Sequence, residues 1–201
     1  MIRIATLIVL LTGCAAGGNN QTLAPRVDET TGETIVTLRE AVVLSRPVPY
    51  LSTAARDFLY LGPVEVDRTG AQEFYLWVGV GSTVDREFAA DEALFTPAEI
   101  TIYTDGTQQS FVLEAWHPDA DVSPYAVEVP LQQSLRARVT IDELENIARA
   151  QALEAAVSNA AGESARYSFW RGKMPSWSVI AEETGVGFSV EVKSAPDKVT
   201  D

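Results

Sequence analysis

Alternation of apolar and polar residues at every second position constrains this chain more than any other feature of its sequence. In the clearest case Ile100 and Ile102 alternate with polar residues, and Asp105-Gly106 follows at the end of the segment. Phe111 and Leu113 then repeat the spacing on the return segment. A period of two places such residues on one face of a strand, and an Asp-Gly pair between two such segments is typical of a hairpin turn. We therefore expect an antiparallel hairpin here.

Most of the chain after residue 33 has the same strand character, and we expect about nine strands. The segment 73–80 is apolar on both faces, which predicts a central strand that is covered on both sides. It follows segment 58–66 through Asp67-Arg68-Thr69-Gly70, a connection typical of a hairpin. The other predicted strands are 35–38, 41–44, 125–131, 135–141, 165–170 and 187–193.

One segment has helical spacing instead. Thr140-Ile141-Asp142-Glu143 matches the capping box that starts a helix, and Leu144 and Ile147 follow at helical spacing. The segment is rich in Ala to about Ser158, and Asn159 and Gly162 suit a helix exit. The predicted fold class is α+β, mainly β: an antiparallel sandwich or open-barrel-like sheet with one amphipathic helix in the C-terminal half.

The N-terminus has the form of a secretory leader. A positive charge at Arg3 precedes the apolar run 4–11, which is too short to span a bilayer because about 20 residues are needed. The following Leu11-Thr12-Gly13-Cys14 resembles the lipobox of bacterial lipoproteins. The resemblance implies that signal peptidase recognises Leu11, Thr12 and Gly13, and that Cys14 carries the lipid anchor.

The resemblance also implies a location. Ala15 follows Cys14, whereas Asp at that place commonly retains lipoproteins of enteric-type bacteria at the inner membrane. The expected location is therefore the periplasmic face of the outer membrane, with the inner membrane or a Gram-positive cell membrane as alternatives. Cys14 is the sole cysteine, so no disulfide can form within the chain.

The domain organisation follows from these features. We expect a signal peptide at 1–13, a lipidated Cys14 with a flexible tether at 14–32, one β-rich domain at 33–194 and a polar tail at 195–201. A flexible tether of this length spans about 25 Å on average.

The charge balance excludes one class of partner. The chain has 28 acidic and 15 basic side chains, a net charge of -13, and binding to nucleic acid requires clustered Lys and Arg. We expect no nucleic-acid partner.

Catalytic, cofactor and metal motifs are missing from the sequence. The single His117 lies near Asp119 and Asp121, but zinc sites have three or four ligands in which His or Cys dominate, and here there is one His and no spare Cys. Calcium needs more oxygen ligands at regular spacing, so turn formation explains the two aspartates better. There is no G-x-S-x-G or S-x-x-K motif for a serine nucleophile, and Gly79-Val80-Gly81 lacks the Lys and the helix of a phosphate loop. We therefore expect no catalytic residues of a known motif, no cofactor and no metal. A catalytic pair of carboxylates stays open, because the spacing of acidic residues in the sequence does not reveal one.

The stretch 169–177 is the strongest candidate for contact with a partner. It combines aromatic, cationic and flexible apolar side chains, the types that are enriched at the centres of protein interfaces. The candidate contact residues are Trp170, Arg171, Lys173, Met174 and Trp177. The alternative is that Trp170 and Trp177 fill the core.

Three hypotheses for function follow. The first is a non-enzymatic binding or assembly accessory of the envelope, anchored to the membrane by lipid and docking a protein or wall polymer. The second is a carrier of a lipid or another apolar ligand inside a half-open β fold. The third is a periplasmic hydrolase that uses two carboxylates.

Overall fold

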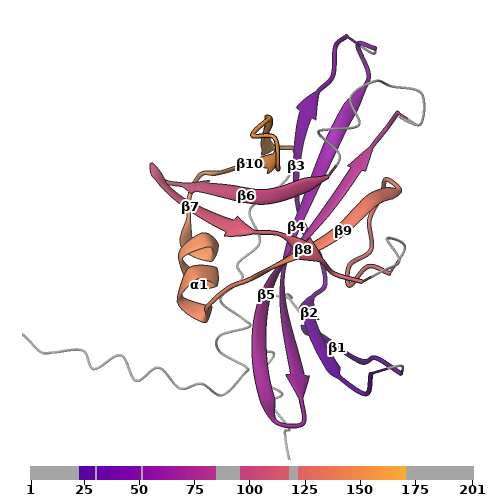
Figure 1. The fold of residues 1–201 in the computed structure, drawn as a ribbon, viewed down its shortest axis with the longest axis vertical. Helices are drawn as coiled ribbons and strands as arrows, with labels where there is room; N and C mark the ends of the chain where they lie inside the picture. Colours follow the sequence, from indigo (N-terminus) through magenta and orange to yellow (C-terminus); the bar gives the residue numbers. More distant parts are fainter. Residues whose placement is uncertain (1–22, 30, 51, 85–95, 118–121, 171–201) are drawn as a thin grey trace, which may run out of the picture.

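A computed structural model describes residues 23–29, 31–50, 52–84, 96–117 and 122–170 of the chain (Figure 1). These residues form eleven strands and one helix, and every strand pairing is antiparallel. The elements are β1 (Leu23–Val27), β2 (Thr34–Leu38), β3 (Val42–Pro47), β4 (Arg56–Arg68), β5 (Ala71–Ser82), β6 (Pro97–Thr104), β7 (Thr107–Val112), β8 (Glu114–Ala115), β9 (Leu131–Arg138), α1 (Ile141–Arg149), β10 (Leu153–Asn159) and β11 (Ser164–Phe169). The predicted class, mainly β with one helix, is confirmed.

The sheet curls until its two ends almost meet. Its strand order is β7-β6-β10-β11-β3-β4-β5-β9-β8, so the first and last members are β7 and β8. Only Leu113 separates these two strands in the chain, and its N–H still donates to Ala98 O on β6. Trp116 N–H, just beyond β8, donates to Ser134 O on β9. One stretch of chain therefore pairs with β6 at its start and with β9 at its end, which nearly closes a barrel.

The hairpin of β4 and β5 is the longest part of the sheet. It turns at Thr69-Gly70, where both residues have positive φ, and Asp67 Oδ1 accepts a hydrogen bond from Gly70 N–H. Two shorter strands share the other edge of β4: β3 pairs with its first half and β2 with its second half. The hairpins expected at 67–70 and at Asp105-Gly106 are both confirmed.

Aliphatic side chains occupy the inside of the barrel. Paired positions on the inward face include Leu59 with Val80, Leu61 with Val78, and Ala155 with Ile102, and each of these residues is at most 1% exposed. An antiparallel barrel of about eight strands has an interior that side chains alone can fill. The inward face of this barrel is accordingly a core.

The predicted helix begins where expected but ends earlier. Thr140 is the N-cap, and its capping box with Glu143 is complete. The helix stops at Arg149, and the prediction that it continues to about residue 158 is wrong. Residues Leu153–Asn159 form β10, which pairs with β6 on one side and β11 on the other. Ala and Leu are strong helix formers, but helix propensity contributes less than about 1 kcal/mol per residue. Strand pairing on both sides with buried side chains overrides that preference.

Asn159 and Gly162, expected at a helix exit, instead shape the turn from β10 to β11. Gly162 has a φ of 85°, and Asn159 Oδ1 accepts from the N–H groups of Ala161 and Glu163. The strand predicted at 165–170 is confirmed as β11.

The predicted strand 125–131 is also wrong. Only Leu131 belongs to a strand, as the first residue of β9, while residues 122–130 cross the outer face of the sheet without strand pairing. Tyr125, Val127 and Val129 do pack on the hydrophobic core. The alternation of apolar residues therefore reflects a covering segment with one side against the sheet.

The N-terminal boundary of the domain lies earlier than the predicted residue 33. Residues Leu23–Val27, expected in the tether, form β1 and pair with β2. Four of these five residues are exposed, so the segment has no apolar alternation that would indicate a strand. The predicted strand 187–193, the leader and residues 14–22 lie outside the described residues.

Candidate functional site

Few of the predicted site residues fall within the described part of the chain. Trp170 is described, whereas Arg171, Lys173, Met174 and Trp177 lie outside it, as do Leu11, Thr12, Gly13 and Cys14. The surface around Trp170 can therefore be built from the structure, and the lipidation site cannot.

Trp170 lies on the outer face of the barrel wall, directly after β11. Its backbone N–H donates to Val43 O at 3.1 Å, which extends the pairing of β11 with β3. Its ring meets the Phe58 ring edge-on at 5.8 Å between centroids, and the Arg56 guanidinium lies 4.3 Å from its centroid. The side chain is half-buried, so one part of the indole packs on the sheet and another part reaches solvent.

A row of aromatic side chains continues from Trp170 across the outer face. Phe58 stacks near Tyr60, and farther along Trp77 lies 5.3 Å from Tyr125, which belongs to the covering segment. Trp77 Nε1 donates to Ser134 Oγ at 2.9 Å. These rings are almost fully buried, so the middle of the row stabilises the fold and is closed to a partner.

The other end of the row is partly exposed to solvent. We call this end the Arg136 cluster, and it comprises Glu73, Tyr75, Trp116, Arg136 and Arg138. The Arg136 guanidinium lies 4.7 Å from the centroid of the Tyr75 ring, and Trp116 meets the same ring edge-on at 6.4 Å. Arg136 Nε is buried and forms an ion pair with Glu114 Oε1 at 3.4 Å, although it donates no hydrogen bond within the described residues. Arg, Trp and Tyr are the side chains most enriched among residues that dominate binding energy.

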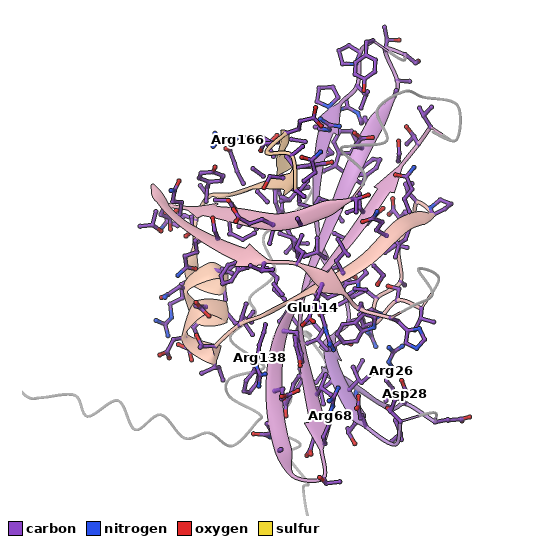
Figure 2. The ribbon with its side chains drawn as sticks, viewed as in Figure 1. Arg26, Asp28, Arg68, Glu114, Arg138 and Arg166 are labelled. Carbon is purple, nitrogen blue, oxygen red and sulfur yellow. The ribbon has the colours of Figure 1, made fainter. Side chains whose placement is uncertain are left out.

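Two hydrogen bonds to Glu73 organise the cluster. The Tyr75 hydroxyl donates to Glu73 Oε2 at 2.7 Å, and Arg138 donates to Glu73 Oε1 at 2.8 Å. The Tyr75 hydrogen bond and the nearby arginines lower the pKa of Glu73, whereas burial and the Glu73 hydrogen bond raise the pKa of Tyr75. Figure 2 shows where the cluster lies: Arg138 and Glu114, the ion-pair partner of Arg136, are on the same part of the molecule, and Arg166 lies far from both.

The inside of the barrel holds one ion pair. Arg46 Nε and Nη2 both lie within hydrogen-bond distance of Asp57 Oδ2, at 2.8 and 2.7 Å. The Asp57 side chain is fully buried, while 19% of the Arg46 side chain is exposed. The guanidinium is 5.5 Å from the centroid of the Tyr167 ring. The pair ties β3 to β4.

Glu65 is the described carboxylate that comes closest to the acid of the hydrolase hypothesis. It is 4% exposed, and burial followed by the nearby Asp67 charge raises its pKa. Both acids also have structural roles, because Gln72 Nε2 donates to Glu65 and Asp67 holds the turn at Gly70. These contacts explain the two carboxylates without catalysis.

The residues around His117 show no metal cage in the described part of the chain. His117 is exposed, and Asp119 and Asp121 lie outside the described residues. Among those residues no group of three or more His, Cys, Asp or Glu side chains is arranged to hold a metal ion.

Reasoning from the sequence missed the Arg136 cluster. The alternation that faces Arg136 and Arg138 away from Leu135 and Ala137 was the available signal, because it placed two cations on the outer face. Their partners come from β5 and from the chain after β8, and only the sheet register brings these together.

Comparisons of the chain with protein-family models, curated proteins and solved structures find no match. Within the described residues, the one helix is too short and too polar to cross a membrane.

Proposed function

We propose that this protein is a lipid-anchored, non-enzymatic binding or assembly accessory of the bacterial envelope. Cys14 carries the anchor, and the partner is an envelope protein or a wall polymer. The contact surface is the stretch 170–177, with Trp170 as its point of attachment to the barrel.

The position of Trp170 is the observation that carries the proposal. The indole is held on the barrel wall by Phe58 and Arg56 and stays half-exposed. Arg171, Lys173, Met174 and Trp177 follow it within seven residues of chain. An aromatic side chain that packs on the barrel wall and is followed in the sequence by cationic and apolar residues has the composition expected at the centre of an interface.

The barrel interior favours this proposal over the carrier. Large aliphatic side chains with at most 1% exposure occupy the inward positions, as in a packed core. The hydrolase alternative would have to rest on Glu65 and Asp67, whose hydrogen bonds already give them structural roles.

The test of the contact surface replaces Arg171, Lys173, Met174 and Trp177 together by Ser and keeps Trp170, because Trp170 packs on the core. The anchored protein is cross-linked in its own envelope and purified, and the bound species are identified by mass spectrometry. We expect a specific species that is captured by the parent chain and lost with the variant, while the circular dichroism spectrum stays unchanged.

The matched control replaces two cationic and two large apolar side chains that are exposed and lie outside the proposed surface. Its substitutions are Arg149→Ser, Arg166→Ser, Tyr50→Ser and Val112→Ser. Equal capture by the parent chain and the first variant would overturn the proposed surface. Mass spectrometry of the N-terminal peptide tests the anchor separately, since we expect lipid on Cys14.

A further inference from the structure

Among the described residues, few side-chain contacts hold strand β1 to the rest of the molecule. Leu23 is half-buried and packs against the core, whereas the other four residues of the strand are exposed. The apolar Val27, for example, has 64% of its surface exposed to solvent. Beyond Leu23, Arg26 Nη1 donates to Ser123 O at 3.3 Å. Figure 1 shows β1 on the outside of β2, at the rim of the sheet.

The backbone pairing of β1 is also sparse. Asp28 N–H donates to Glu33 O, and antiparallel ladders alternate between bonded and non-bonded pairs. Arg26 and Ala24 therefore direct their N–H and C=O groups toward β2, whereas Leu23, Pro25 and Val27 direct theirs outward. Pro25 has no N–H to donate. A short, exposed strand with two bonded pairs lies at the low end of local stability.

The strand also sets the length of the tether. Nine residue steps separate Cys14 from Leu23, which limits the span of that chain to about 30 Å at full extension. If β1 detaches, twenty steps separate Cys14 from Thr34, the first residue of β2, and the limit rises to about 70 Å.

We propose that β1 is a releasable strap that gives the anchored barrel two reaches from the membrane. With β1 paired, the barrel stays close to the bilayer. With β1 released, the barrel and its contact surface extend farther toward a partner. The inference about reach rests on the proposed lipid anchor at Cys14, whereas release of β1 is a property of the fold alone.

Hydrogen exchange measured by NMR on the full chain tests the release. The register directs the N–H groups of Ile35 and Thr37 toward β1 and that of Val36 toward β4. If β1 opens while β2 stays in place, Ile35 and Thr37 should show protection factors at least ~100-fold below that of Val36. Protection of Ile35 and Thr37 equal to that of Val36 would overturn the proposal.

A disulfide lock provides the matched control. Val27 and Thr34 form a non-bonded pair, for which Cα atoms about 4.5 Å apart suit a disulfide. Val27→Cys with Thr34→Cys is made in a Cys14→Ser background for the exchange experiment. Oxidation should raise the protection of Ile35 and Thr37 to the level of Val36, and reduction should restore fast exchange. Oxidation without effect would count against release of β1.

The reach is tested with the lipidated chain, which retains Cys14 and carries the same lock. Energy transfer from tryptophan to a dansyl lipid in phosphatidylcholine vesicles should be higher in the oxidised than in the reduced form. Equal transfer would overturn the two reaches. Absence of lipid on Cys14 would overturn the anchor and leave the exchange result intact, so the two failures are distinguishable.

Discussion

The Tyr125 hydroxyl donates a hydrogen bond of 2.5 Å to the carbonyl oxygen of Pro63, and the Tyr125 ring lies directly over Gly62. A Cβ atom on Gly62 would come within 2.3 Å of that ring. This contact fastens the covering segment to the middle of β4, at the point between the stretches that pair with β3 and β2. Glycine is required here by the ring above it.

Gly62→Ala should therefore destabilise the protein by displacing Tyr125. Overpacking of a tight core costs about 1–3 kcal/mol, and loss of the buried hydrogen bond adds about 1 kcal/mol. The measurement is the free energy of unfolding in urea. In a Tyr125→Ala background the same Gly62→Ala change should cost far less, because the ring that it would meet is gone. Equal costs in the two backgrounds would show that the contact is not the reason for the glycine.

The Arg46–Asp57 pair should respond unequally to loss of its two members. Arg46→Met leaves a fully buried carboxylate without its guanidinium, and removing one partner of a buried pair costs about 3–5 kcal/mol. Asp57→Asn leaves a guanidinium that is partly exposed and can turn toward water, so its cost should be smaller. Urea unfolding of both variants and of the double variant measures the order and the coupling. The reverse order would contradict the burial seen here.

Replacing the buried Glu65 by Gln should stabilise the protein to an extent that depends on pH. A carboxyl whose pKa is raised on folding contributes stability below its unfolded pKa and loses that contribution as the pH rises through its folded pKa. Burial and the nearby Asp67 charge disfavour the ionised form of Glu65 in the folded protein. Glu65→Gln keeps the shape and an acceptor for Gln72, so it should raise the free energy of unfolding at pH 7 and change it little below about pH 4.

The control for that series is Glu40→Gln, at an exposed position. Urea unfolding is compared between neutral and acidic pH for both variants. A Glu65→Gln variant that is less stable than the parent at pH 7 would show that the carboxylate is needed in its ionised form. That result would return Glu65 to consideration as a functional acid.

The elements that sequence patterns predicted are those in which neighbours in sequence are also neighbours in space. The turns at Thr69-Gly70 and Asp105-Gly106 and the capping box of Thr140 each involve residues a few positions apart. Their geometry is decided locally, so the pattern is sufficient.

The wrong predictions concern segments whose partners lie far away in the sequence. The strand that contains Ala155 is flanked by β6 and β11, and no local pattern shows that pairing. The apolar alternation that includes Tyr125 is real, but its partner is the outer face of β4 and β5 rather than a neighbouring strand. The proposed contact surface 170–177 was found from the sequence, whereas the Arg136 cluster depends on the register between β5 and β9.

Pro25 should protect the edge that β1 forms in the described part of the sheet. It lies at the centre of β1, where its position directs the backbone nitrogen away from β2 and toward solvent. Proline there removes a donor that another strand would need, which is a common defence against edge-to-edge pairing. Pro25→Val restores that donor and adds a β-branched side chain beside the exposed Val27, so we expect concentration-dependent dimers in sedimentation velocity. The control is Pro47→Val, at the end of a strand that is paired on both sides, which should stay monomeric wherever the parent chain does. If both variants sediment like the parent, the edge of β1 is protected by something other than its proline.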